Sequence, residues 1–268
     1  MSSPLEAQTA AIPNHGSQAS LIAPSFEREI TYQQIIFCSV VIGVVGGLIA
    51  TAYYNLLEVS LHFLWQTLPD ILQPYFPSKF PSWNYVWMAP TLGGFLVGIT
   101  LYFMGLPGEV SLVVDKVHNP GHIELHQTPA MVVASWISIA FGGSAGPEAP
   151  LVQVIGSFGG WLGQQLKLVA ATTRVLTFCG MSAALGAFFG APLGGALFAL
   201  EIPHRRGLEY YEAVVPAVLS AILSFSVFRL TTGLSIGGMY HFAAIPPLSL
   251  IHLVQGALLG AAGALVAI

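Results

Sequence analysis

The feature that most constrains this chain is an apolar run near its start that carries no charged side chain. The run extends from Gln33 to Tyr54. An α-helix needs about 20 consecutive apolar residues to cross the hydrocarbon core of a bilayer. Further apolar runs with few charges follow at residues 85–104, 172–189, 208–230 and 248–268. The sequence therefore predicts an integral membrane protein with several spans.

The overall composition excludes a soluble protein. Charged residues make up 7% of the chain, whereas a soluble domain carries roughly 25%. Even a large soluble core needs a polar surface, so a lipid bilayer has to replace water around most of this protein. The runs are apolar on every face, which favours spanning helices over barrel strands of alternating polarity. Eight lysines and arginines are too few for a nucleic-acid-binding surface, so we expect no nucleic acid partner.

Glycine and proline interrupt the apolar sequence at three places where it has membrane character. The breaks lie at residues 105–108, 142–147 and 190–192, and the apolar runs resume after them at 149–168 and 193–202. Unpaired backbone is not tolerated in lipid, so breaks at membrane depth have to lie inside protein or beside water. Broken helices whose N-termini converge are how transporters hold anions. The alternative is that each break is an ordinary loop between helices, as we expect for the proline-rich stretch Pro69 to Pro81.

Glu148 stands where the second break gives way to an apolar run. A carboxylate at a helix N-terminus is stabilised by the free N–H groups and the helix dipole, by about 0.3–1 kcal/mol. The same donors would bind a halide if the carboxylate moved away. From the residues alone, Glu148 is equally well explained as a simple helix cap or as a gate that competes with an anion.

Two segments together resemble the family of CLC voltage-gated chloride channels and proton/chloride antiporters. Residues 146–153 read Gly-Pro-Glu-Ala-Pro-Leu-Val-Gln, similar to the family pattern Gly-x-Glu-Gly-Pro-x-Val-Gln. Residues 190–201 read Gly-Ala-Pro-Leu-Gly-Gly-Ala-Leu-Phe-Ala-Leu-Glu, similar to Asn-Ala-Pro-Leu-Ala-Gly-x-Leu-Phe-x-x-Glu. The resemblance starts near residue 34. It implies an all-α membrane fold with broken and re-entrant helices, corresponding to the first half of a CLC-type inverted-repeat domain.

The resemblance implies transmembrane transport of chloride or another small anion, with Glu148 as the gate. The anion would be held by backbone groups at helix N-termini, and the complete protein would be a homodimer. The resemblance implies no cofactor, no metal and no enzymatic reaction, and it places the chain in the cell membrane with several passes. The expected anion-binding residues are Gly105, Leu106, Gly146, Glu148 and Ala149.

Two departures from the family pattern affect selectivity and proton coupling. The family's first anion loop reads Gly-Ser-Gly-Ile-Pro-Glu, but residues 104–109 read Met-Gly-Leu-Pro-Gly-Glu. Gly105 therefore stands in place of the serine, and the side chain that would select one anion over another is missing. Antiporter members often carry a second Glu after the position matching Glu201, where this chain has Ile202. Glu201 is left as the candidate proton relay.

Three other patterns have weaker functional interpretations. His118, His122 and His126 recur every four residues, but Pro120 and Gly121 break any helix between them. We expect a solvated loop there, not a metal site. Residues 143–146 do not match the Gly-x-Ser-x-Gly spacing of a hydrolase elbow. The pair 205–206, two arginines, is expected to be a cytoplasmic anchor.

We divide the chain into a disordered, cytoplasmic N-terminal tail over residues 1–32 and a CLC-like transmembrane domain over 33–268. The domain is expected to be truncated after its first repeat, because we find no second copy of the Gly-x-Glu-x-Pro pattern. Three explanations of the missing second repeat are open: the chain is a fragment or truncated gene product, it pairs with a separately encoded second half, or it forms a dimer that completes the pore. The alternative function is that of a non-conducting structural or regulatory membrane subunit.

Overall fold

Helices make up most of the described chain, as the apolar runs predict. A computed structural model describes residues 28–72, 82–105, 123, 128–202, 211–234 and 249–267. The predicted tail therefore lies almost wholly outside the described residues. The helices are α1 (Tyr32–His62), the π-helix η1 (Phe63–Thr67), α2 (Leu68–Leu72), α3 (Ser82–Met104), α5 (Thr128–Ala140), α6 (Glu148–Gln165), α7 (Ala170–Phe189), α8 (Pro192–Glu201), α9 (Tyr211–Thr232) and α10 (Leu250–Ala267).

Four of the described helical stretches are long and apolar enough to cross a membrane. They are Tyr32–Leu72, Tyr85–Met104, Ala170–Phe189 and Tyr211–Thr232. The first is 41 residues long, or roughly 60 Å at 1.5 Å per residue, about twice the thickness of the hydrocarbon core. By contrast, α5 and α8 have 13 and 10 residues, too few to span. Four of the five predicted spans are thus confirmed by length and composition, whereas the predicted span at 248–268 falls among the shorter apolar helices of the described chain.

The long first helix continues further than the sequence predicts. We expected a loop over Pro69 to Pro81, but Pro69–Leu72 is helical in α2, and 73–81 lie outside the described residues. Proline is tolerated there because the helix has already changed register: the Leu68 N–H donates to the Phe63 carbonyl, five residues back. At the other end the Gln34 side chain accepts a 3.0 Å hydrogen bond from the Thr31 N–H and caps α1.

Small residues let α7 sit at the centre of the helical body. Most of α7 is buried, and it contacts α1, α6, α8 and α9. A Cβ atom on Gly180 of α7 would lie 2.7 Å from the Ile155 carbonyl carbon of α6. A Cβ on Gly43 of α1 would lie 2.6 Å from the Ser220 carbonyl oxygen of α9. These backbones approach as closely as small residues permit in membranes.

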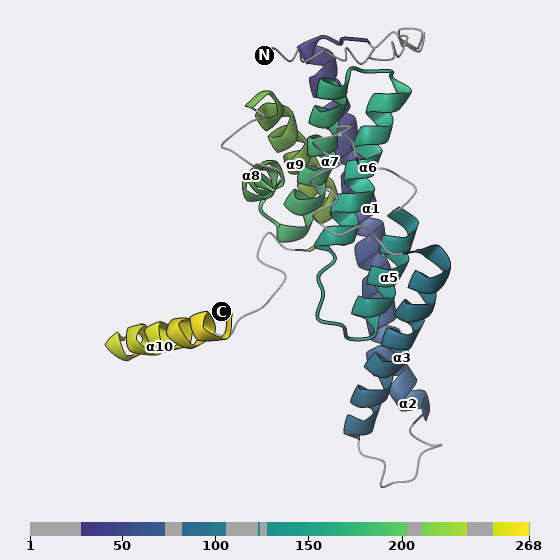
Figure 1. Ribbon diagram of the computed structural model, residues 1–268, viewed down its shortest axis with the longest axis vertical. Helices are drawn as coiled ribbons and strands as arrows, with labels where there is room; N and C mark the ends of the chain where they lie inside the picture. The colour runs from purple at the N-terminus through teal and green to yellow at the C-terminus, as the bar shows by residue number, and fades with distance from the viewer. Residues whose placement is uncertain are drawn as a thin grey trace, which may run out of the picture.

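The described helices lie in two groups along α1 (Figure 1). α6, α7 and α9 pack beside the N-terminal part of α1, and α8 lies against α7 and α9. α3 and α5 lie beside the C-terminal part of α1. α10 lies apart from the others in Figure 1, and its side chains from Leu250 to Val266 are exposed. The connection from α5 to α6 therefore runs between the two groups.

Candidate functional site

The predicted break between α5 and α6 is confirmed as a short irregular segment. α5 ends at Ala140 and α6 begins at Glu148. Gly142 turns the chain with a φ of +90°, a conformation that glycine adopts without steric cost. The Gly143 N–H donates to the Ser138 carbonyl at 2.7 Å, and the Ala145 N–H donates to the Gly143 carbonyl at 2.9 Å. The segment is therefore tied to the end of α5.

The first turn of α6 presents two backbone N–H groups that no helical carbonyl accepts. Pro147 is the N-cap residue and Glu148 the first helical residue. The first bond of the helix is donated by the Leu151 N–H to the Pro147 carbonyl, at 3.2 Å. Pro147 and Pro150 have no N–H. The free donors of this helix end are therefore those of Glu148 and Ala149, where the helix dipole also favours negative charge.

The Glu148 carboxylate folds back over the backbone of the break. A Cβ atom on Gly146 would overlap Oε2 of Glu148 and lie 2.7 Å from its Oε1. The glutamate side chain therefore fills the space that a side chain at 146 would need. Glu148 is half-buried, whereas Gly146 and Ala149 are exposed. This arrangement brings together three of the predicted anion-binding residues at one helix N-terminus.

The break between α7 and α8 has a basic neighbour that sequence reasoning missed. Gly190 ends α7 in the left-handed conformation, with a φ of +67°. A Cβ on Gly190 would lie 2.9 Å from a guanidinium nitrogen of Arg229, and that guanidinium lies 5.3 Å from the centroid of the Phe225 ring. A lone arginine in the apolar run of α9 was the available signal, because charges at membrane depth are costly and are retained for function.

Gly105 is not placed as an anion donor in this structure. It ends α3 with a φ of +84°, and its N–H donates to the Leu101 carbonyl at 2.9 Å. The predicted role required a free N–H at a helix N-terminus, whereas this glycine closes a helix C-terminus. Leu106 and the rest of its loop lie outside the described residues.

Glu201 is the last residue of α8 and is exposed, and Ile202 beside it is half-buried. The structure does not bring Glu201 into contact with Glu148.

The histidines at 118, 122 and 126 and the arginines at 205 and 206 lie outside the described residues. Residues 143–146 follow a helix, whereas a hydrolase elbow follows a strand.

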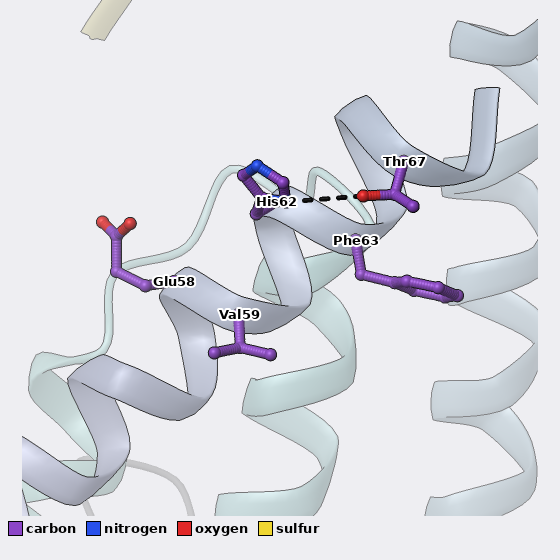
Figure 2. A pocket seen from close by; sticks show the side chains of 5 residues that line it. All are labelled: Glu58, Val59, His62, Phe63 and Thr67. Carbon is purple, nitrogen blue, oxygen red and sulfur yellow. Dashed lines mark hydrogen bonds between the residues drawn. The ribbon is translucent and has the colours of Figure 1, made fainter. Parts of the chain in front are cut away.

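A hollow of about 470 Å³ lies on the flank of the long first helix (Figure 2). It is lined by Glu58, Val59, His62, Phe63 and Thr67, all from α1 and η1. His62 Nδ1 lies 3.4 Å from Thr67 Oγ1. None of the predicted anion-binding residues lines it, so it is separate from the candidate site.

Comparison with known proteins agrees with the paired motifs. Residues 93–268 match the family model described as voltage gated chloride channel. A chloride/fluoride channel protein of Pseudomonas syringae pv. tomato is 34% identical over 145 residues, which are 53% of this chain and 32% of that protein. A putative chloride channel protein ClcB-like of Ralstonia nicotianae is 29% identical over 165 residues, 58% of this chain and 38% of that protein.

A similar fold occurs in the crystal structure of a CLC-type fluoride/proton antiporter. The TM-score is 0.60 at 22% sequence identity, and the match covers 85% of this chain and 54% of the antiporter. The chain thus spans about a third of the two relatives and about half of the solved structure. The family model matches well over half of the chain and includes both motif segments. This chain therefore belongs to the voltage gated chloride channel (CLC) family.

Proposed function

We propose that this chain forms part of a transmembrane pathway for small anions, with Glu148 as its gate. The observation that carries the proposal is the Glu148 carboxylate, which folds over Gly146; Glu148 is also the first residue of α6, whose first turn has two N–H groups without helical acceptors. Membership of the CLC family supports transport over an unrelated structural role. We propose no enzymatic reaction for the site.

The gate follows from competition for one set of donors. The N–H groups of Glu148 and Ala149 stabilise a negative charge, whether it belongs to the carboxylate or to a bound anion. An ionised carboxylate near these donors repels an entering anion. Protonation removes the charge of the carboxylate, so the neutral side chain leaves the donors to the anion. Because the protonated fraction grows as pH falls, anion flux through this pathway rises with acidification.

The anion itself is a separate proposal, and both chloride and fluoride are candidates. The names of a relative and of the similar structure include fluoride as well as chloride. Backbone N–H groups bind any small anion that sheds its water, so selectivity depends on how tightly the site encloses it.

Proton coupling by the usual family route is disfavoured, because Ile202 cannot carry a proton. Glu201 is the alternative relay, since an intramembrane carboxylate is a functional candidate. Its exposure at the end of α8 is compatible with proton exchange with water. Uphill proton movement driven by a chloride gradient in sealed vesicles would establish coupling and overturn a channel-like mechanism.

Reconstitution into proteoliposomes tests the proposed function directly. Flux of chloride, bromide, nitrate and fluoride is measured with the missing half of the pathway supplied, for the wild type and for Glu148→Gln, which resembles the protonated carboxyl. The wild type is expected to conduct more at low pH, and Glu148→Gln to conduct at every pH with little further response. A mutant that keeps the full wild-type pH response would place the gate elsewhere.

We further propose that residues beyond this sequence complete the anion pathway. The chain covers 54% of the antiporter whose fold it shares, and transporter sites form where two repeats meet. The rest of a longer chain, a separately encoded second half or a second copy of this chain would supply the missing half. Selective, Glu148-dependent flux from this polypeptide alone, as a monomer, would refute this proposal. Vesicles that stay tight even with a completing partner would favour the alternative of a non-conducting subunit.

A further inference from the structure

A π turn in the first helix leaves one carbonyl without a helical donor. In η1 the Leu68 N–H donates to the Phe63 carbonyl, five residues back. The next donor in that register would be residue 69, but Pro69 has no N–H. The Leu64 carbonyl instead accepts a hydrogen bond from the Tyr85 hydroxyl of α3. The π turn is thus held by an anchor from another helix, and such turns recur at functional sites.

The π turn carries Trp65, whose indole reaches the end of α5. Its Nε1–H donates to the Ala140 carbonyl at 2.9 Å. The ring lies 5.9 Å from the Tyr85 ring, edge to face. Its Cζ2 atom would be 2.8 Å from a Cβ placed on Gly142. Trp65 therefore touches both the last residue of α5 and the glycine that turns the chain.

The Trp65 indole donates a hydrogen bond to the Ala140 carbonyl, which receives no N–H from the described backbone at the start of the break. At the end of α5 the carbonyls of Ile137, Ser138 and Ile139 accept the N–H groups of residues 141, 143 and 142. Among the described residues, the indole is the donor that reaches the Ala140 carbonyl, and Ala140 is buried. A buried carbonyl without a partner is costly. The Trp65 bond therefore stabilises this particular course of the chain at the start of the break.

We propose that Trp65 is a positioning residue for the Glu148 gate, acting through the segment from Ala140 to Glu148. The segment is eight peptide bonds long, tied to α5 at one end by Trp65 and carrying the gating carboxylate at the other. The proposal rests on the proposed function of Glu148. In this proposal the π turn holds Trp65 against Ala140 and so determines where the break begins. The start of the break in turn determines where the free N–H groups of α6 and the Glu148 carboxylate lie.

Trp136 offers a matched control from the same contact between α1 and α5. Its Nε1–H donates to Ser60 Oγ at 3.0 Å, and neither group belongs to the break. Trp65→Phe and Trp136→Phe each remove one indole N–H and keep an aromatic ring. Gly142→Ala perturbs the same contact from the other side, because its methyl group meets the Trp65 ring, and it also strains the backbone at a φ of +90°.

Two measurements on these variants test the proposal. Amide exchange over residues 141–149 is followed in lipid nanodiscs, and the pH profile of anion flux is followed in vesicles. Trp65→Phe and Gly142→Ala are expected to speed exchange in this segment about fivefold, as for the loss of one hydrogen bond. Both are expected to displace the pH midpoint of flux, while Trp136→Phe leaves exchange and midpoint unchanged.

Exchange in Trp65→Phe that equals that of Trp136→Phe would overturn the proposal. If Trp65→Phe does not fold, Tyr85→Phe decides by the same two criteria, because it removes the hydroxyl that holds the π turn at the Leu64 carbonyl and leaves the backbone of the break unchanged. A wild-type chain that carries no anion even when the missing half of the pathway is supplied contradicts the proposed function, and the exchange measurement still decides whether Trp65 orders the break. Faster exchange with an unchanged pH profile in a conducting protein would show that Trp65 does not position the gate.

Discussion

Replacing Gly180 with alanine should force α6 and α7 apart. The new Cβ would lie 2.7 Å from the Ile155 carbonyl carbon and 2.9 Å from the Gly156 Cα, whereas carbon atoms pack at about 3.5–4.0 Å. Both contacts are backbone atoms, so no side chain can rotate away. The helices have to separate by roughly 1 Å, and overpacking of this kind costs about 1–3 kcal/mol. Alanine's better helix propensity returns at most about 1 kcal/mol.

Thermal unfolding in detergent measures this cost, with Gly94→Ala as the matched control. Gly94 lies in the interior of α3, and a Cβ there meets nothing within 4 Å. For a chain of this size about 1 kcal/mol corresponds to 2–4 °C in Tm. Gly180→Ala is therefore expected to melt several degrees below wild type, and Gly94→Ala at or slightly above it. Equal melting temperatures for the two variants would refute the claim that α6 and α7 meet at backbone contact.

Three further predictions concern the site and the core. Gly146→Ala should expel the Glu148 carboxylate from its place over the backbone, so flux should lose much of its pH response; an unaltered response would contradict that placement. Gly190→Ala should cost about 1 kcal/mol, because alanine is strained at positive φ and meets the Arg229 guanidinium; Tm measured beside Gly94→Ala checks it. Phe178→Ala should cost about 3–5 kcal/mol, because Phe178 is fully buried; denaturation in mixed micelles should show the loss.

Much of the helix pattern could be predicted from local sequence. Glycine and proline mark the ends of α5, α7 and the start of α8, because their backbone preferences act on the residues that carry them. The start of α6 at Glu148 follows from the same rule. The exception is Pro69, where we predicted a loop. Helix continues there because the π turn had already shifted the hydrogen-bond register before the proline.

The roles of individual backbone groups could not be predicted in the same way. Gly105 was expected to offer its N–H to an anion, but that N–H caps α3 through Leu101. Arg229 and Gly190 lie 39 positions apart in the sequence and meet only through the packing of α7 against α9. Trp65 and Ala140 are 75 positions apart, and nothing near either residue indicates the other.

The sequence by itself therefore determined the membrane surroundings of this protein, the positions of the four described spans, the breaks between its helices and the carboxylate at the start of α6. Composition and the local chemistry of glycine and proline decide these features. Only the tertiary structure decided which N–H groups stay free, where the Glu148 carboxylate lies and which side chains hold the break. The physical reason is that helices apolar on every face have no polar side to orient them. Which face of each helix meets a neighbour depends on close packing of small residues across the whole body.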